Sequence, residues 1–328
     1  MNLQHLRNYL DGRTEPVCAY LYDLAHLRRR ADTLRRCLID QGILLIHVES
    51  EHQLRRLDWI ARRRNQRADI LLRVNPASVP QQATLRMGGQ ATQFGIEEAQ
   101  IPALIELALG LPGVRLKGLH IHSISNNLDA QTHLALLQYY FDLAHAWQQR
   151  YQLEFDWLNA GGGIGINYAD PQASFDWEGF CTGLAALIVA RRPRFQLVFE
   201  CGRFLTADCG YYLADVTDLK HTHGKHFAIL RGGSHHFRLP ASWQHNHPFV
   251  VLPREVWPYP FPRPAVHETP VTLCGELCTP KDTLACDVRV ERLRAGDCIA
   301  FLLAGAYGWH ISHHDFLSHP HPERVYLD

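Results

Sequence analysis

Three consecutive segments decide the fold of this chain: LKGLHIH at residues 116–122, a long segment at 130–150, and FDWLNAGGG at residues 155–163. The first and third are short and apolar, which predicts strands, whereas the middle one has the length and residue types of a helix. A strand, a helix and a second strand in this order form a parallel pair with a crossover helix. The rest of the chain can be interpreted outward from this unit.

The same alternation extends in both directions. Asp23 is a good N-cap for the first helix. Strands alternating with helices indicate a parallel sheet covered by helices. The further strands are predicted at 43–48, 70–74 and 195–200, and the further helices at 23–37, 51–64, 97–109 and 177–191.

Beyond about Phe204 the pattern changes to strands separated by turns, which predicts a mostly antiparallel β-domain. The strand at 17–22 is expected to join this domain. We therefore predict an incomplete α/β barrel domain at 24–203, with about five strands, and a β-domain formed by 1–23 and 204–328. The strands of the β-domain are predicted at 211–219, 226–230, 249–252, 271–274, 284–290 and 298–303.

The bulk composition is that of an ordinary soluble globular protein. The 328 residues are 46% hydrophobic, and 33 Lys and Arg balance 33 Asp and Glu, so nothing indicates a nucleic-acid or membrane partner. The N-terminal residues show no apolar signal core. The nine cysteines have no disulfide-framework spacing, so we expect a reduced, cytoplasmic protein.

Two motifs follow predicted strands and suit an anion. Gly161–Gly163 can bring backbone N–H groups to a phosphate, although a plain tight loop is about as consistent with a glycine triplet. Arg203 can pair with phosphate as a charged fork. The carboxylate of Glu200 can pair with a protonated ring nitrogen of a pyridine-type ligand, or it can form an ordinary salt bridge with Arg203.

His120 and His122 project to the same side of their strand because side chains alternate with a period of two. Only His122 lies near the carboxyl end of the strand, where barrel sites are built. A lone strand histidine is more often a satisfied core residue, so the motif alone decides nothing.

In combination the motifs resemble the fold-type III pyridoxal-phosphate decarboxylases, the ornithine/diaminopimelate decarboxylase family. The resemblance covers nearly the whole chain and implies an alanine-racemase-like (β/α)8 barrel with a C-terminal antiparallel β-domain. It is carried by Arg73-Val-Asn-Pro76, Gln93-Phe-Gly95, Gly118-Leu-His-Ile-His122, Leu158-Asn-Ala-Gly-Gly-Gly163, Glu200-Cys-Gly-Arg203, Cys278-Thr-Pro-Lys-Asp282 and Gly305-Ala-Tyr307.

The resemblance also implies the site and its cofactor, pyridoxal 5'-phosphate. His122 would stack on the pyridine ring, and Glu200 would face its nitrogen. Catalytic Cys278, with Asp282 near it, would come from the partner subunit of a homodimer with shared sites that acts on a small amino-acid substrate. The phosphate would be held by Ser125, Gly161, Gly162, Gly163, Gly202, Arg203 and Tyr307.

Within the family, the segments 274–282 and 312–322 resemble the decarboxylases of citrate-type siderophore biosynthesis. Relatives acting on polyamine precursors or lysine usually carry an acid after the cysteine, where this chain has Thr279. The resemblance therefore implies a diaminopropionate- or serine-type substrate, or a citryl conjugate.

The chain departs from the family at the lysine that carries the cofactor as a Schiff base. The family barrel has eight strands, with the lysine on the first, whereas only five barrel strands are predicted here. The segment at 23–37 runs almost directly into the strand that matches the family's fourth. The four lysines are Lys117, Lys220, Lys225 and Lys281, and none is predicted at the carboxyl end of a barrel strand.

The cluster of histidines at 310, 313, 314, 319 and 321 invites a metal interpretation, but no carboxylate–histidine motif accompanies it, and we expect no metal. Two alternatives to a decarboxylase stay open. One is a non-catalytic homologue that acts by binding a partner, and the other is an enzyme that uses a phosphate ligand without the cofactor.

Overall fold

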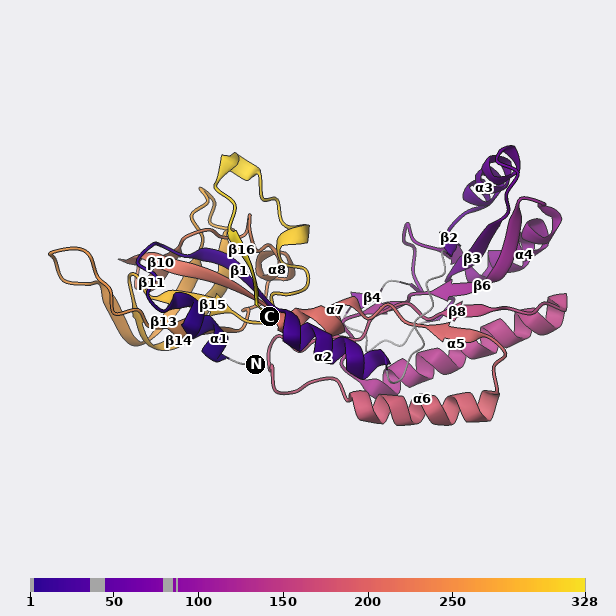
Figure 1. The fold of residues 1–328 in the computed structure, drawn as a ribbon, viewed down its shortest axis with the longest axis horizontal. Coiled ribbons are helices and arrows are strands. Elements are labelled where there is room, and N and C mark those ends of the chain that lie inside the picture. The colour runs from indigo at the N-terminus through magenta and orange to yellow at the C-terminus, as the bar shows by residue number, and fades with distance from the viewer. Residues whose placement is uncertain (1–2, 36–44, 79–84, 87, 328) are drawn as a thin grey trace. The chain divides into compact units, whose positions relative to one another are not determined.

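The computed structural model describes residues 3–35, 45–78, 85–86 and 88–327 (Figure 1). The chain divides into two compact units. The α/β unit comprises Thr33–Asn167 and Gln172–Phe204, and the β unit comprises Met1–Asp32, Tyr168–Pro171 and Leu205–Asp328.

The α/β unit is built on a parallel sheet in the order β2-β3-β6-β8-β9, with β5 paired to β3. Among the described residues, β2 and β9 are the two ends of this order. The strands are β2 Ile46–Val48, β3 Ala68–Asn75, β5 Ile96–Glu97, β6 Val114–Ile121, β8 Trp157–Asn159 and β9 Gln196–Val198, and a separate pair is formed by β4 Leu85–Arg86 and β7 Ile124–Ser125.

Continuous apolar runs explain the parallel strands. Ile70, Leu71 and Leu72 of β3 are all fully buried, as expected when both faces of a sheet are covered. Gly118 of β6 has a φ of 154°, and a Cβ there would lie 1.7 Å from the backbone oxygen of Trp157 in β8. This position therefore requires glycine for the two strands to pair.

Three helices of the α/β unit, α3, α5 and α6, begin at side-chain caps that the sequence supplies. Asp129 accepts a hydrogen bond from the backbone N–H of Thr132 at 2.7 Å, and Ser50 and Asp176 cap two other helices in the same way. Figure 1 shows α5 and α6 side by side, and the ring of His133 meets that of Phe180 edge-on at 5.4 Å. These helices are α3 Glu51–Arg63, α4 Ile101–Gly110, α5 Ala130–Tyr151 and α6 Trp177–Arg191, with a 3-10 turn at Glu98–Gln100.

The β unit contains a sheet in the order β12-β15-β10-β11-β13-β14, with β1 between β10 and β16. Most pairs are antiparallel, whereas β1–β16 and β11–β13 are parallel. The strands are β1 Cys18–Asp23, β10 Gly210–Thr222, β11 Lys225–Leu230, β12 Phe249–Leu252, β13 Ala265–Cys274, β14 Thr283–Arg294, β15 Cys298–Phe301 and β16 Glu323–Leu327.

Aromatic rings fill the core of the β unit, where Tyr212, Phe237 and Phe301 are buried and in mutual contact. The remaining helical elements of the chain are α1 Leu3–Leu10, α2 Leu24–Arg35, α7 Gly202–Thr206, α8 Leu239–Trp243 and 3-10 turns at Ala207–Cys209, Trp309–Ile311 and Phe316–Ser318.

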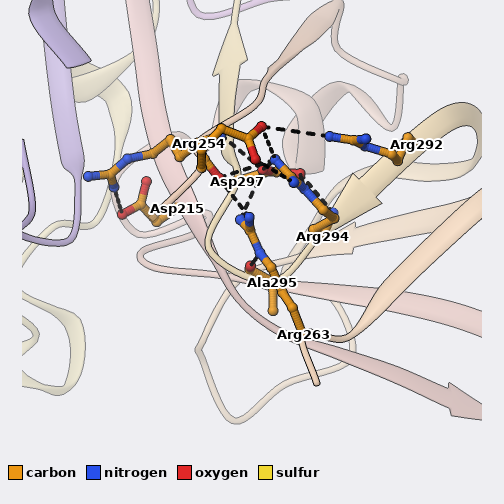
Figure 2. Close-up of polar contacts among 8 residues, drawn as sticks. Asp215, Arg254, Arg263, Arg292, Arg294, Ala295 and Asp297 are labelled. Carbon is orange, nitrogen blue, oxygen red and sulfur yellow. Dashed lines mark hydrogen bonds and ion pairs between the residues drawn. The ribbon is translucent and has the colours of Figure 1, made fainter. Parts of the chain in front are cut away.

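A network of buried charges holds the long connection between β12 and β13 (Figure 2). Asp297 accepts hydrogen bonds from the backbone N–H of Arg254 and from the guanidinium groups of Arg263 and Arg294, at 2.9 to 3.2 Å. Arg254 also pairs with Asp215 at 2.8 Å. The two ends of the connection are thus fastened to the turn between β14 and β15.

The strand–helix alternation and the change to strands near Phe204 are confirmed, and Asp23 caps α2 by accepting from the N–H of His26 at 2.7 Å. The sequence did not predict α1 or β16. The start of the predicted strand at 43–48 and the junction at Cys37 and Leu38 lie outside the described residues. The proposed domain boundaries at 23/24 and 203/204 stay a prediction.

Candidate functional site

The carboxyl ends of four parallel strands bring polar side chains together in the α/β unit. Asn159, the last residue of β8, donates a hydrogen bond to the carboxylate of Glu200 at 2.8 Å. Its Nδ2 also lies 3.4 Å from Nε2 of His47 in β2. His120 of β6 stacks on His47 with ring centroids 4.1 Å apart, and its Nε2 is 3.8 Å from Glu200.

The histidines of this group are neutral at pH 7. Burial, with a contribution from the neighbouring His47, lowers the pKa of His120 to about 2, and burial also lowers the pKa values of His47 and His122. His120 is buried, and neither of its ring nitrogens has a hydrogen-bond partner within the described chain. Glu200 is the contrasting member, because its side chain is 47% exposed.

His122 and the glycine loop lie against one another. The backbone N–H of Gly162 donates to Nδ1 of His122 at 3.1 Å, so the neutral ring carries its proton on Nε2. A Cβ on Gly161 would lie 2.6 Å from Nδ1 of His122, and one on Gly162 would lie 2.3 Å from the backbone oxygen of Glu200. The loop therefore needs its glycines to pass between His122 and Glu200.

The other residues proposed for phosphate in the α/β unit lie beside this loop or just after β9. Ser125 belongs to β7, and a Cβ on Gly163 would lie 2.5 Å from the backbone oxygen of its neighbour Ile124. Gly202 begins α7 and has open space around its Cβ position, and Arg203 is buried.

Three predicted site residues belong to the β unit. Cys278 is exposed and Asp282 is buried, and both lie between β13 and β14. Asp282 accepts hydrogen bonds from the backbone N–H groups of Ser234 at 2.6 Å and Leu277 at 2.9 Å. Tyr307 follows β15, is 43% exposed and has a φ of 54°.

The positions of the lysines agree with their predicted distance from the ends of the barrel strands. Lys117 lies inside β6 and pairs with Asp156 at 2.5 Å, and Lys225 pairs with Asp287 at 2.7 Å. Lys220 lies in β10, and Lys281 lies in the connection between β13 and β14. In the part of the chain that the structure describes, no lysine lies at the carboxyl end of a parallel strand of the α/β unit.

Sequence analysis missed His47 and Asn159 as members of the site. Asn159 stands directly before the glycine triplet and could have been found from that position. His47 could have been found by aligning its strand beside β3.

The sequence matches the family described as pyridoxal-dependent decarboxylase, C-terminal sheet domain, over residues 19–305. It is 48% identical over 299 residues to the 2-[(L-alanin-3-ylcarbamoyl)methyl]-2-hydroxybutanedioate decarboxylase of Staphylococcus aureus, covering 91% of this chain and 75% of that protein. It is 30% identical to the L-glutamyl-[BtrI acyl-carrier protein] decarboxylase of Niallia circulans, covering 88% of this chain and 68% of that protein.

Among solved structures, the chain resembles diaminopimelate decarboxylase from Helicobacter pylori complexed with L-lysine. The TM-score is 0.82, and the match covers 100% of this chain and 94% of that one at 18% identity. This likeness supports the fold. In the described part of the chain, no helix is both long and apolar enough to cross a membrane.

Pyridoxal phosphate needs an acid for its pyridine nitrogen, a flat side chain against its ring, donors for its phosphate and an amine for its aldehyde. The exposed carboxylate of Glu200, the neutral ring of His122 and the glycine loop suit the first three. The fourth requirement is unmet in the described α/β unit, because Lys117 is its one lysine and is paired with Asp156. The residues present therefore fit non-covalent binding of the cofactor.

Proposed function

This chain belongs to the pyridoxal-dependent decarboxylases, whose cofactor is pyridoxal phosphate, and we propose that its α/β unit binds that cofactor at the carboxyl ends of β6, β8 and β9. The observation that carries the proposal is the exposed carboxylate of Glu200, which the side chain of Asn159 holds by a 2.8 Å hydrogen bond beside the glycine loop.

When bound, pyridoxal phosphate supplies an electron sink for the electrons released as carbon dioxide leaves an amino acid. The protein's part is to keep the pyridine nitrogen protonated and the ring in place. Glu200 does the first through its charge, and Asn159 orients it. His122 is proposed to keep the ring in place by stacking on it. Its imidazole is neutral and its Nδ1 accepts from the N–H of Gly162, so it adds no positive charge beside the protonated pyridine nitrogen.

The remaining assignments rest on the match of these residues to the family's motifs. Backbone N–H groups of the glycine loop and of Gly202, the guanidinium of Arg203 and the hydroxyl groups of Ser125 and Tyr307 are proposed to hold the phosphate. Cys278 is proposed to deliver a proton to the carbon that loses carbon dioxide. In this proposal Asp282 acts as a positioning residue, since it fixes the N–H of Leu277 next to Cys278.

We propose a substrate in which an amino acid with a short side chain is linked to citrate, in siderophore biosynthesis. The name of the Staphylococcus aureus relative, at 48% identity, describes a molecule of this kind. Thr279 after the cysteine fits a substrate without a free distal amine. We further propose a cytoplasmic homodimer in which Cys278 and Asp282 serve the partner subunit's cofactor.

The absence of the lysine favours a second candidate function. This function is that of a non-catalytic homologue that binds a partner. Such a chain could still bind the cofactor through Glu200 and the glycine loop, and it would not need the amine. Turnover and binding must therefore be measured separately. Rates for enzymes of ordinary efficiency are about 1 per second or more.

The test is a titration of the purified chain with pyridoxal phosphate, followed by visible absorbance and by quenching of tryptophan fluorescence. Glu200→Gln keeps the size of the side chain and removes its charge, and we expect it to weaken binding about tenfold or more, the value of one charge-assisted contact. Arg203→Ala should weaken binding similarly, and the matched control Arg289→Ala, at an exposed arginine of the β unit, should not.

Equal affinity in the wild type and in both site variants would contradict the proposed site. Release of carbon dioxide from a citrate-linked diaminopropionate would decide between the two functions. A rate near 1 per second would establish the enzyme, whereas retained binding without release would favour the non-catalytic candidate.

A further inference from the structure

Three side chains from separate segments of the β unit converge on one point. His235 follows β11, Glu276 follows β13, and His319 precedes β16. One donor atom from each lies within 4.8 Å of the other two. Nδ1 of His319 is 3.6 Å from Oε1 of Glu276, and the rings of His235 and His319 have their centroids 4.8 Å apart.

His235 is the member of this group that calls for an explanation. It is completely buried, and neither of its ring nitrogens has a hydrogen-bond partner within the described chain. A buried imidazole without partners is costly, because its nitrogens lose their hydrogen bonds to water. A ligand bound by the ring would remove this cost.

We propose that His235, Glu276 and His319 form a binding site for a divalent transition-metal cation of the zinc type. Two imidazole nitrogens and one carboxylate suit zinc, cobalt, nickel or iron, and they do not suit magnesium or calcium, which prefer oxygen. A tetrahedron with bonds of about 2.0–2.1 Å has edges of roughly 3.4 Å, close to the separation of His319 and Glu276.

Three protein ligands leave a fourth position open, as in catalytic zinc sites. Glu276 and His319 have side chains that are 33% and 25% exposed, so that position can be reached by water or by an oxygen of a small molecule. His235 supplies the ligand from the protein interior.

Hydrogen bonds fix the backbone next to each proposed ligand. Asp282 accepts from the N–H of Ser234 and from that of Leu277, which are the sequence neighbours of His235 and Glu276. The ring of His236 bonds through Nε2 to the backbone oxygen of Pro320, beside His319, at 2.9 Å. Such outer contacts orient ligands in known metal sites.

The segment that delivers His319 is held in an unusual conformation. Leu317 and Ser318, immediately before it, have φ values of 56° and 57°. Two successive residues other than glycine in the left-handed region are strained, and strain of this kind persists where the surroundings fix it. A bound cation would be one such constraint.

The charges of the site favour a cation over an anion. Burial lowers the pKa of His235 to about 4, so this ring is neutral at pH 7 and offers a lone pair. The carboxylate of Glu276 would repel a phosphate or a carboxylate. The geometry and the donor atoms carry the proposal, and these charges agree with it.

The α/β unit contains a second group of the same kind, formed by His47, His120 and Glu200. Glu200 is assigned above to the cofactor, so this group serves as the internal comparison. The Zn2+ titration therefore includes a variant of each group, Glu200→Gln and Glu276→Gln, to show which group binds the cation.

The experiment is a titration of the full chain with Zn2+, by equilibrium dialysis and calorimetry, after treatment with a chelator. We expect one tight site per chain in the wild type. Glu276→Gln and His319→Gln should each weaken Zn2+ binding at least about tenfold, since the loss of an outer contact alone costs about 10- to 100-fold in metal sites. His267→Gln, at an exposed histidine of β13, is the matched control and should bind as the wild type does.

Co2+ gives a second measurement that does not depend on the variants, because bound cobalt with fewer than six ligands absorbs strongly in the visible. We expect that absorption in the wild type and its loss in Glu276→Gln. Equal Zn2+ affinity in the wild type and both variants would overturn the proposal. So would loss of binding in Glu200→Gln with retention in Glu276→Gln, or a wild type without the cobalt absorption.

Discussion

Replacing Asp282 by asparagine separates a structural role from a purely chemical one. The carboxylate is buried, and its two oxygens accept from the backbone N–H groups of Ser234 and Leu277. It lies in a space made by two glycines: a Cβ on Gly233 or Gly275 would come within 2.5 Å or 2.1 Å of it. Asparagine has the same shape but only one oxygen.

The magnitude follows from these contacts. The asparagine side chain could accept from one of the two N–H groups, and its amide would face the other donor. Hydrogen bonds to a charged group contribute about 1.5–3 kcal/mol each, and a buried unsatisfied donor costs about 1–3 kcal/mol. We therefore expect Asp282→Asn to lower the free energy of unfolding of the β unit by about 2–4 kcal/mol, and Asp282→Ala by more.

Urea unfolding followed by circular dichroism measures the change, and amide exchange at Ser234 and Leu277 locates it. Both amides should exchange faster in Asp282→Asn. The matched control is Asp315→Asn, whose exposed pair with His321 at 2.9 Å should contribute about 0–1 kcal/mol. The structural role of Asp282 is refuted by two results together. The free energy of unfolding of Asp282→Asn would lie within about 0.5 kcal/mol of the wild-type value, which is close to the error of the extrapolation. The amides of Ser234 and Leu277 would also stay protected from exchange.

Two further predictions concern packing and pH. Gly118→Ala should destabilise the α/β unit by about 3 kcal/mol or more because the new Cβ meets Trp157, whereas Gly110→Ala, with open space around it, should change stability by less than about 1 kcal/mol; thermal unfolding of both variants checks this. Burial lowers the pKa of His247 to about 3, so the unfolded chain takes up a proton that the folded chain refuses. The contribution of the neutral His247 to the free energy of unfolding is complete above about pH 6.5. It is lost as the pH falls toward about 3, by up to about 1.4 kcal/mol per pH unit. The urea midpoint should therefore fall less steeply between about pH 7 and 4.5 in His247→Gln than in the wild type.

The parallel sheet could be predicted because its strands are apolar on both faces. Ile70, Leu71 and Leu72 are consecutive and all fully buried, which is the pattern that distinguishes such strands from amphipathic ones. Three of the helices also begin at local caps: Asp129 needs only Thr132, three residues away. Signals that act within a few residues are visible in a sequence.

The rest of the fold depends on distant partners. β16 is five residues long and mostly exposed, and it forms a strand because β1, near the opposite end of the chain, pairs with it. α1 is also short, and its buried residues, Leu6 and Leu10, are held by the unit around it. Neither segment has a pattern long enough to stand out in the sequence.

The candidate sites show the same division. The glycine triplet follows one predicted strand and Glu200 ends another, so their approach could be expected from parallel topology. The group around His235 could not, because its three members are far apart in the sequence and come from three different connections of the β unit. A metal site at the histidines 310–321 was not predicted because no carboxylate accompanies them in the sequence. In the fold, Glu276 lies close to His319 and is such a carboxylate.

Binding and turnover place different demands on this chain, and the described strands offer candidate groups only for binding. The groups proposed for the pyridine ring and the phosphate stand at the ends of β6, β8 and β9, all of which are present and paired. The resemblance assigns the Schiff-base lysine to a strand for which no counterpart is predicted from this sequence, and the sheet of the described residues ends at β2 and β9, each with one side unpaired. Because the amine and the proposed ring site belong to different strands, a chain without the first can lack the covalent step and still bind the cofactor as proposed. The proposed metal site belongs to the β unit alone, so its occupancy can be measured whichever way the question of turnover is decided.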